Sequence, residues 1–473
     1  MVSGAVFGDP FQATEQWYTI GSGAVTIRAR PLTTVAHRKR RSTMTTTFAD
    51  VRIFPRRPDE APVDVVVDEG RITAIAPAGA DRSGGAGSAA ERSGEAGSGT
   101  APAGEVVEGR GRVLLPGLGD VHAHLDSNRL GQTFRPHTAD GTLHGYIMND
   151  RANWRSGERS VRDQASFAIA AIIASGGVRI RSHAQVDADT GLERFAGVRD
   201  ALAAHNDVLD AQIVAFPQAG IVREKGVKDL LDAALSEGAD LVGGLDPLQY
   251  DRDPKTHLDI VFDLAEKHGA GVDIHLHEGG TAGVYSFEEI AHRTTTLGLQ
   301  GKVTISHAFA LNTNPEPVVR RLAELLAEAG ISVTTVAPQK GCLPQDILGE
   351  QRVAIGLGED GQRDYWSPYG DGDLLRRTWQ LAFTNGFRRD EDIEHCLDIA
   401  SRGGAQVMVG ARPEGAALVE DARFGLGVGA PADFMLLDAD TVTSAIMDCP
   451  VDRDVFKAGR LVASGGELLG GVR

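Results

Sequence analysis

Cysteines, aromatic side chains and long apolar runs are all scarce in this sequence. Its 473 residues include three cysteines, Cys342, Cys396 and Cys449, and only 5% aromatic residues. Three scattered cysteines without a CxxC pair form neither a disulfide framework nor a thiolate metal site, so we expect a reducing, cytoplasmic setting. No stretch reaches the roughly 18 consecutive apolar residues of a membrane-spanning helix, which excludes a transmembrane protein.

Positive charge is scarce as well. The chain has 48 Lys and Arg residues against 65 Asp and Glu residues, a formal net charge of −17. Nucleic-acid affinity comes mainly from clustered basic side chains, so nucleic acid is not an expected partner. Residues 1–43 are the exception, because they carry a net charge of +4 and leave −21 for the rest of the chain.

Two segments are set aside before the fold is considered. The composition changes at Met44, and we expect this methionine to be the true start, with 1–43 a non-native or disordered extension; a native basic arm is the alternative. Residues 77–105 contain a near-repeat of Gly, Ala and Ser and no Val, Ile, Leu or aromatic residue. Such a stretch has too little apolar area to offset the entropy of ordering it, so it is predicted to be a disordered surface loop.

The rest of the chain alternates short apolar strands with amphipathic helical stretches. The predicted strands are Val113–Val121, Val178–Ser182, Ala211–Phe216, Leu241–Leu245, Gly271–His275, Lys302–Ser306, Ile331–Val336 and Val353–Leu357. The predicted helices are Val161–Ala174, Leu192–Ala204, Val227–Glu237, His257–His268, Phe287–Leu297, Pro317–Ala329 and Leu374–Phe383. This alternation is typical of an α/β fold, here a distorted TIM (β/α)8 barrel over about 116–420, with an open doubly wound sheet as the rival.

The two ends of the chain carry further short strands that need each other as partners. Residues 46–115 and 421–473 are therefore predicted to form a small β-sandwich beside the barrel.

Candidate metal ligands follow the ends of several predicted strands. The first strand ends in His122-Ala-His124, where alternate side chains share one face, and the fifth ends in His275-Leu-His277-Glu278. His307 and Asp360 follow the sixth and eighth strands, at the face where barrel enzymes assemble their sites. Four imidazoles, those of His122, His124, His275 and His307, and one carboxylate suit one divalent ion such as Zn²⁺ or Fe²⁺ better than Mg²⁺ or Ca²⁺.

Several motifs resemble the metal-dependent amidohydrolase superfamily. They are Pro116-Gly-Leu-Gly-Asp-Val-His-Ala-His-Leu-Asp, the His275, His307 and Asp360 series, and the closing Ala432-Asp-Phe-Met-Leu-Leu-Asp and Val455-Phe-Lys-Ala-Gly-Arg-Leu-Val. Arg181-Ser-His, Gln212-Ile-Val-Ala-Phe-Pro-Gln, Leu241-Val-Gly-Gly-Leu-Asp and Arg363-Asp-Tyr-Trp-Ser-Pro-Tyr-Gly are similar to its cytosine deaminase and N-isopropylammelide amidohydrolase branch.

The resemblance implies a role for each matching residue. It implies that His122, His124, His275 and Asp360 hold the metal, with His307 joining the shell or binding the hydroxide and substrate. Gln218 matches an amide that hydrogen-bonds the substrate ring, and Trp366 matches an aromatic that lines the pocket. His183, at the end of the second strand, is a candidate hydrogen-bond partner of the substrate or of a neighbouring ligand, with plain packing as its alternative.

The acid/base position carries two candidates at once. The resemblance implies a Glu at the position of Glu278 in cytosine deaminases, and a His at the position of His277 in the triazine hydrolases. We favour Glu278 as the proton shuttle, with His277 as the alternative, because a partly desolvated carboxylate near a cation can be tuned for both steps. Gly361 stands where the relatives have a ring-reading Asp or Asn, and Ser127 stands where the triazine enzyme has a Lys.

The predicted activity is hydrolytic deamination of an aminated nitrogen heterocycle, with Glu278, His277, His307 and Asp360 as catalytic residues. Cytosine-like pyrimidines are the first expected substrates, and amino- or alkylamino-triazines are the second. Cyclic amide ring opening, which usually needs a carboxylated Lys on the fourth strand, and a non-catalytic binding barrel are the other hypotheses. The expected partners are the heterocycle, water and further copies of this chain in a homo-oligomer, without nucleic acid or membrane.

Overall fold

The computed structural model describes residues 16–20, 25–29, 45–54, 61–79, 104–339, 341–409 and 425–470. Most of the predicted extension 1–43 and most of the predicted insert 77–105 lie outside these residues. Within the first, β1 (Gln16–Ile20) and β2 (Val25–Ala29) pair as antiparallel strands. The remaining described strands form one eight-stranded sheet and one nine-stranded sheet.

The eight-stranded sheet is the barrel. Its strands, all parallel and hydrogen-bonded in chain order, are β8 (Leu118–Ala123), β9 (Gly177–Gln185), β10 (Asp210–Phe216), β11 (Leu241–Leu245), β12 (Gly271–His275), β13 (Val303–Ser306), β14 (Ser332–Thr335) and β15 (Ile355–Leu357). A parallel bridge between Ala123 and Asp360 brings the first and last strands together. The distorted barrel is therefore confirmed, because a doubly wound sheet would reverse its strand order at a switch point.

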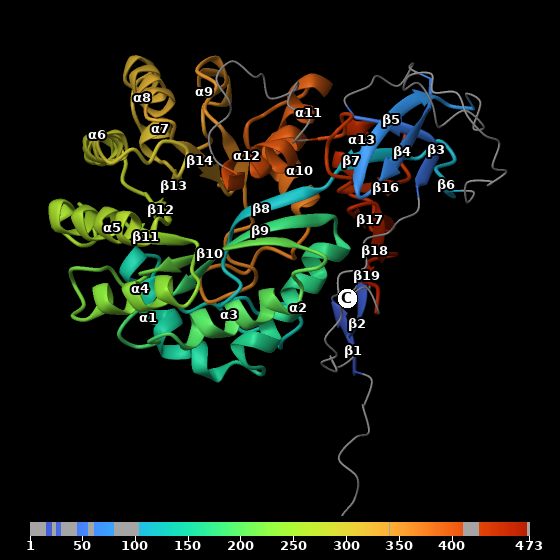
Figure 1. Ribbon diagram of the computed structural model, residues 1–473. Helices are drawn as coiled ribbons and strands as arrows, with labels where there is room; N and C mark the ends of the chain where they lie inside the picture. Colours follow the sequence, from blue (N-terminus) through green and yellow to red (C-terminus); the bar gives the residue numbers. More distant parts are fainter. Residues whose placement is uncertain are drawn as a thin grey trace, which may run out of the picture.

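Helices surround the barrel (Figure 1). They are α1 (Leu143–Asn153), α2 (Val161–Ala174), α3 (Glu193–Ala203), α4 (Val227–Ser236), α5 (Pro254–His268), α6 (Gly280–Thr296), α7 (Ala310–Thr313), α8 (Glu316–Glu328), α9 (Gln345–Glu350), α10 (Leu374–Thr384), α11 (Asp390–Asp398) and α12 (Gly404–Val409). Sequence signals fix the ends of α5: the Asp253 side chain accepts from Thr256 N, Pro254 opens the helix, and Gly269 ends it with φ of 66°. Helix α6 begins at Gly280, well before Phe287, where the sequence predicted that this helix would begin.

The first predicted barrel strand is wrong in its extent. The run Val113–Val121 divides at Gly117 into β7 (Val113–Pro116), which belongs to the second sheet, and β8, which opens the barrel. A Cβ at Gly117 would lie 2.5 Å from a Val178 methyl carbon, so the chain crosses between the two sheets where only glycine fits. A continuous apolar run does not reveal such a change of sheet.

The second sheet unites both ends of the chain, as predicted. Its strands are β3 (Thr46–Ile53), β4 (Val63–Asp68), β5 (Arg71–Pro77), β6 (Glu105–Glu108), β7, β16 (Phe434–Leu437), β17 (Arg453–Lys457), β18 (Arg460–Ser464) and β19 (Glu467–Leu468), with α13 (Val442–Asp448) between β16 and β17. Strand β3 joins two layers, because its residues up to Val51 pair with β4 and β6, whereas Arg52 and Ile53 at its end pair with β7. Phe48 contacts Phe434 and Phe456 edge-on, each with ring centroids 4.8 Å apart.

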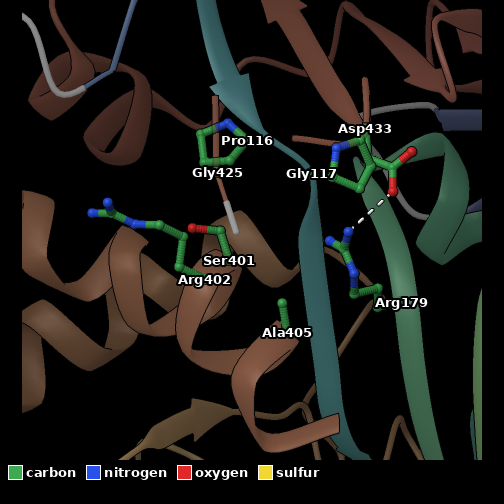
Figure 2. A pocket seen from close by; sticks show the side chains of 9 residues that line it. Pro116, Gly117, Arg179, Ser401, Arg402, Ala405, Gly425 and Asp433 are labelled. Atoms are coloured by element: carbon green, nitrogen blue, oxygen red, sulfur yellow. Dashed lines mark hydrogen bonds and ion pairs between the residues drawn. The ribbon is translucent and has the colours of Figure 1, made fainter. Parts of the chain in front are cut away.

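Ion pairs fasten the sandwich to the end of the barrel where β8 and β9 begin. Asp433, next to β16, accepts from Arg179 of β9 at 3.0 Å (Figure 2). Lys457 of β17 donates to Asp433 at 2.8 Å and to Asp210 of β10 at 2.6 Å. A cavity of about 250 Å³ lies beside this pair and is lined by residues of both domains. In barrel enzymes this face contributes to stability rather than to chemistry.

Two compositional predictions can be compared with the structure. Cys342, Cys396 and Cys449 are all free thiols. Among the described residues, no helix is both long enough and apolar enough to cross a bilayer.

Candidate active site

A cavity lies at the carboxyl ends of the barrel strands and collects most of the predicted site residues. Its empty space, counted with the open mouth, measures about 400 Å³. It is lined by His124, Ser127, Phe216, Gln218, Leu245, His275, His277, His307, Asp360, Asp364 and Trp366. Seven of the ten residues predicted from the sequence therefore line one cavity; His122, His183 and Glu278 do not.

The predicted metal ligands come together at the base of this cavity. His122, His124 and Asp360 form one group, and His122, His275 and His307 form a second, each with donor atoms within 4.8 Å of one another. His124 Nε2 lies 3.3 Å from Asp360 Oδ1 and 3.3 Å from His275 Nε2. Because His122 belongs to both groups, the five side chains form one continuous donor set.

This donor set fits a divalent cation. Within the part of the chain that the structure describes, His122 Nε2 and His275 Nδ1 are buried without a hydrogen-bond partner, which is costly unless another ligand satisfies them. Burial and the neighbouring imidazoles lower the pKa of His122 and of His275, and burial lowers the pKa of His307 to about 3. Burial alone would raise the pKa of Asp360, but its bond with His124 and the adjacent imidazoles hold it well below the usual value. The neutral imidazoles of these three histidines and the ionised carboxylate of Asp360 are the forms that bind a metal. At His124 burial works against the charged imidazole, but the hydrogen bond with Asp360 outweighs it and raises the pKa.

A buried network fixes the tautomer of His122. The Ser306 hydroxyl donates to Asp273 Oδ1 at 2.6 Å, and Asp273 is held by Arg181 at 2.9 Å. Having given its one proton to Asp273, Ser306 accepts from His122 Nδ1 at 3.0 Å. The free lone pair of His122 therefore lies on Nε2, the unpartnered atom.

Three site residues that follow barrel strands have left-handed backbone conformations. His307 and Asp246 come directly after β13 and β11, and Asp360 comes three residues after the end of β15. The φ angles are 63° for His307, 63° for Asp360 and 38° for Asp246. Each such conformation costs a non-glycine residue about 1–3 kcal/mol and persists where the surrounding structure imposes it. The strain turns side chains from three strand ends into this region of the barrel.

His277 forms a dyad with a residue that the sequence analysis did not select. Asp246, at the end of β11, accepts from the His277 backbone N–H at 2.7 Å and pairs with His277 Nδ1 at 2.9 Å. Burial works against a charged imidazole, but the Asp246 carboxylate outweighs it and raises the pKa of His277 above the usual value. The His277 ring lies 4.3 Å from the His307 ring, so the dyad adjoins the donor set.

Glu278 is turned away from the cavity and is fully buried. Its carboxylate accepts from Leu248 N at 2.7 Å and Gln249 N at 2.8 Å, and also from the Ser286 hydroxyl. The loop that it holds follows Asp246 directly. In this geometry Glu278 supports the dyad, while His277, the alternative proton shuttle, lies at the cavity.

The residues expected to contact substrate are divided between the cavity and the core. Gln218 lines the cavity, and within the described part of the chain its side-chain Nε2 is buried without a hydrogen-bond partner. Trp366 stacks against Tyr146 of α1, with centroids 5.4 Å apart and planes inclined by 16°, and forms an aromatic wall. His183 is buried beneath the site, with its ring 4.4 Å from that of His122.

Asp246 and Asp364 are the site residues that sequence reasoning missed. Asp246 follows β11 directly, so the rule that polar residues at strand ends form barrel sites could have found it. Asp364 lies in the irregular segment between β15 and α10, where no periodicity marks a position.

The fold and the donor set define a metal-dependent hydrolase of the barrel class, and comparison with known proteins agrees. The profile of the amidohydrolase family matches residues 105–469. The chain belongs to this family, which confirms the resemblance, and it is a hydrolase acting on carbon–nitrogen bonds.

Individual relatives extend the comparison. The chain is 28% identical to N-isopropylammelide isopropyl amidohydrolase of Pseudomonas sp. (strain ADP) over 365 residues, which cover 75% of this chain and 87% of the relative. The crystal structure of N-isopropylammelide isopropylaminohydrolase from Burkholderia multivorans is similar with a TM-score of 0.78 and 34% identity, covering 90% of this chain and 100% of that one. A 5-methylcytosine deaminase structure from Klebsiella pneumoniae has a TM-score of 0.69 at 22% identity, covering 89% and 97%, and shares the fold.

Proposed function

We propose that this chain hydrolyses the bond between a ring carbon and an exocyclic amino or alkylamino nitrogen of a planar nitrogen heterocycle. The water oxygen bonds to the ring carbon, the carbon–nitrogen bond breaks, and the leaving nitrogen takes up the proton that the water loses. The products are ammonia or an alkylamine and an oxo-heterocycle. The observation that carries the proposal is the His277–Asp246 dyad, whose His277 lines the same cavity as four of the five donor residues.

His122, His124, His275 and Asp360 would hold one divalent ion, Zn or Fe, with His307 joining or facing it. Such an ion lowers the pKa of a bound water toward 7 and supplies a nucleophile at neutral pH. Asp360, kept ionised, also pairs with His124 and holds that ring in place. His307, kept neutral, is available to hydrogen-bond oxygen at the reacting carbon.

His277 is the group that we assign to move the proton. Its Nδ1 is engaged by Asp246, so Nε2 accepts the proton from water and then donates it to the leaving nitrogen. The Asp246 carboxylate stabilises the imidazolium that forms between these two steps. Glu278, whose oxygens are all engaged with the 248–249 backbone and Ser286, acts as a positioning residue in this account.

The placement of His277 favours an aminated s-triazine as substrate over a cytosine-like pyrimidine. The triazine hydrolases are the relatives that the sequence resembles at His277, and two N-isopropylammelide hydrolases are among the similar proteins. Gln218 supplies a donor to the ring, and the Trp366 and Tyr146 rings form a flat wall for it. Aromatic side chains stack favourably on planar rings of this kind.

The test is an amine-release screen with purified protein reconstituted with Zn²⁺ or Fe²⁺. The panel contains N-isopropylammelide, ammelide, cytosine, 5-methylcytosine, guanine and a pterin, and it separates release of ammonia from release of isopropylamine. We expect turnover of a triazine and its loss in His277→Asn. Turnover of cytosine alone would overturn the triazine preference, and no turnover of any ring would overturn the proposed function.

A further inference from the structure

The residue that follows Asp360 has no side chain, yet the space that a side chain would occupy is filled. A Cβ built on Gly361 would lie 2.0 Å from Asp364 Oδ2 and 2.6 Å from Asp364 Cγ. Gly361 is not in the left-handed φ region, so its backbone does not demand glycine. What excludes a side chain at position 361 is the Asp364 carboxylate.

Asp364 is held so that one oxygen is fixed and the other is left almost free. Oδ1 accepts from Trp366 N and Ser367 N, each at 2.8 Å, and this turn also places Trp366. Among the described residues, Oδ2 has only a long contact of 3.4 Å from the Ser127 hydroxyl. The side chain is 4% exposed and lines the same cavity as Gln218 and the donor set.

A buried carboxyl group with an open oxygen needs a partner. Burial and the nearby Asp360 charge raise the pKa of Asp364 to about 7. The raised pKa means that the ionised carboxylate is unfavourable here as long as no further donor or cation stabilises it. A ligand N–H at Oδ2 would relieve that cost with a charge-assisted hydrogen bond. Gln218 lines the same cavity, and its side-chain N–H, unpartnered within the described ranges, is a hydrogen-bond donor, whereas Asp364 Oδ2 is an acceptor.

On the basis of the proposed function, we propose that Asp364 replaces the missing side chain of position 361 as the residue that reads the substrate ring, through an N–H of the heterocycle donated to Oδ2. The ligand class is thereby narrowed to oxo-heterocycles that carry a ring N–H beside a carbonyl. Their carbonyl suits Gln218, and their N–H suits Asp364. Rings methylated on that nitrogen lack the donor.

The sharpest variant is Asp364→Asn. Its Oδ1 can still accept from the Trp366 and Ser367 backbone, while Nδ2 replaces the acceptor at Oδ2 with a donor. The matched control is Asp371→Asn, which makes the same change in the same segment outside this cavity. A second variant, Asp364→Ala combined with Gly361→Asp, moves the carboxylate back to the vacated space.

The readout is equilibrium binding, followed by tryptophan fluorescence because Trp366 lines the cavity. The probes are cyanuric acid and uracil, which carry ring N–H groups beside carbonyls, and their N-methylated derivatives. We expect Asp364→Asn to weaken binding of the N–H probes at least tenfold, with little change for the methylated ones, unchanged metal content and unchanged Tm. The double variant should regain part of the loss, and Asp371→Asn should bind as the wild type does.

Unchanged binding of the N–H probes in Asp364→Asn would overturn the inference, as would an equal loss for methylated and unmethylated rings. Failure of the wild type to bind either N–H probe would overturn it too. The proposed function fails separately, since a wild type that binds these probes but releases no amine in the screen refutes the reaction while the Asp364 comparison stands on binding.

Discussion

The backbone N–H of Asp360 donates to the carbonyl oxygen of His122 at 2.8 Å, and His124 N donates back to Asp360 O at 3.3 Å. These bonds join β8 to the segment after β15 at the seam of the barrel. Both partners supply predicted metal ligands. The register of the seam therefore sets the spacing between the imidazoles of the first strand and the carboxylate of the last.

Gly358→Ala should disturb this seam. A Cβ at position 358 would lie 2.5 Å from His122 Cβ and 2.6 Å from its carbonyl oxygen, so β8 and the 358–360 segment must move apart. We expect a stability loss of about 1–3 kcal/mol, as for overpacking, and at least tenfold weaker metal retention. The measurements are Tm and zinc competition against a chelator. Gly349→Ala, where a Cβ meets nothing within 4 Å, is the control and should leave both unchanged.

Ser306→Ala should weaken the metal site without opening it. The change leaves His122 Nδ1–H without its acceptor and Asp273 Oδ1 without its donor. Loss of such supporting hydrogen bonds typically costs about 10–100-fold in metal affinity. Chelator competition measures the loss. Ser332→Ala, on the next strand and away from the donor set, should keep wild-type affinity, and an unaltered affinity in Ser306→Ala would contradict the tautomer assignment.

His277→Asn and Glu278→Gln should separate the proton shuttle from its support. Removal of His277 takes away the group that carries the proton, and we expect kcat to fall about 10²–10⁴-fold with metal content unchanged. Glu278→Gln keeps an oxygen for the Leu248 and Gln249 amides, so its kcat should stay within about tenfold of wild type. A larger fall in kcat for Glu278→Gln than for His277→Asn would assign the proton shuttle to Glu278.

Phe434→Ala should destabilise the sandwich more than any surface change. Phe434 is fully buried between Phe48 and Phe456, and truncating such a ring typically costs about 3–5 kcal/mol. Urea unfolding measures this free energy. Phe383→Ala on α10, whose side chain is 69% exposed, is the matched control and should cost far less.

The barrel and the donor set were predictable because they leave regular marks in the sequence. Apolar runs alternate with amphipathic stretches, and His124, His275, His307 and Asp360 each stand at the end of such a run. Parallel strands bring their carboxyl ends to one face, so chain position alone predicts that these residues meet.

Orientation could not be predicted in the same way. His277 and Glu278 lie beyond the end of β12 at His275, where the side-chain alternation of a strand no longer has to hold; in the structure His277 lines the cavity and Glu278 does not. Which of the two lines the cavity depends on Asp246 and on the 248–249 backbone, both contributed by the neighbouring strand and its loop. Asp364 was missed because it lies in an irregular segment, where no periodicity marks a position. Its proposed role also depends on the lack of a side chain at Gly361, three residues earlier.

The most direct test of the account is a titration of metal into chelated protein, with amine release from the screened heterocycle and bound metal measured in the same samples. The account predicts that activity rises in proportion to bound Zn²⁺ or Fe²⁺ and saturates at one ion per chain, whereas His275→Ala neither retains the ion nor releases amine. Full amine release from the metal-free protein, or from His275→Ala without bound ion, would contradict it.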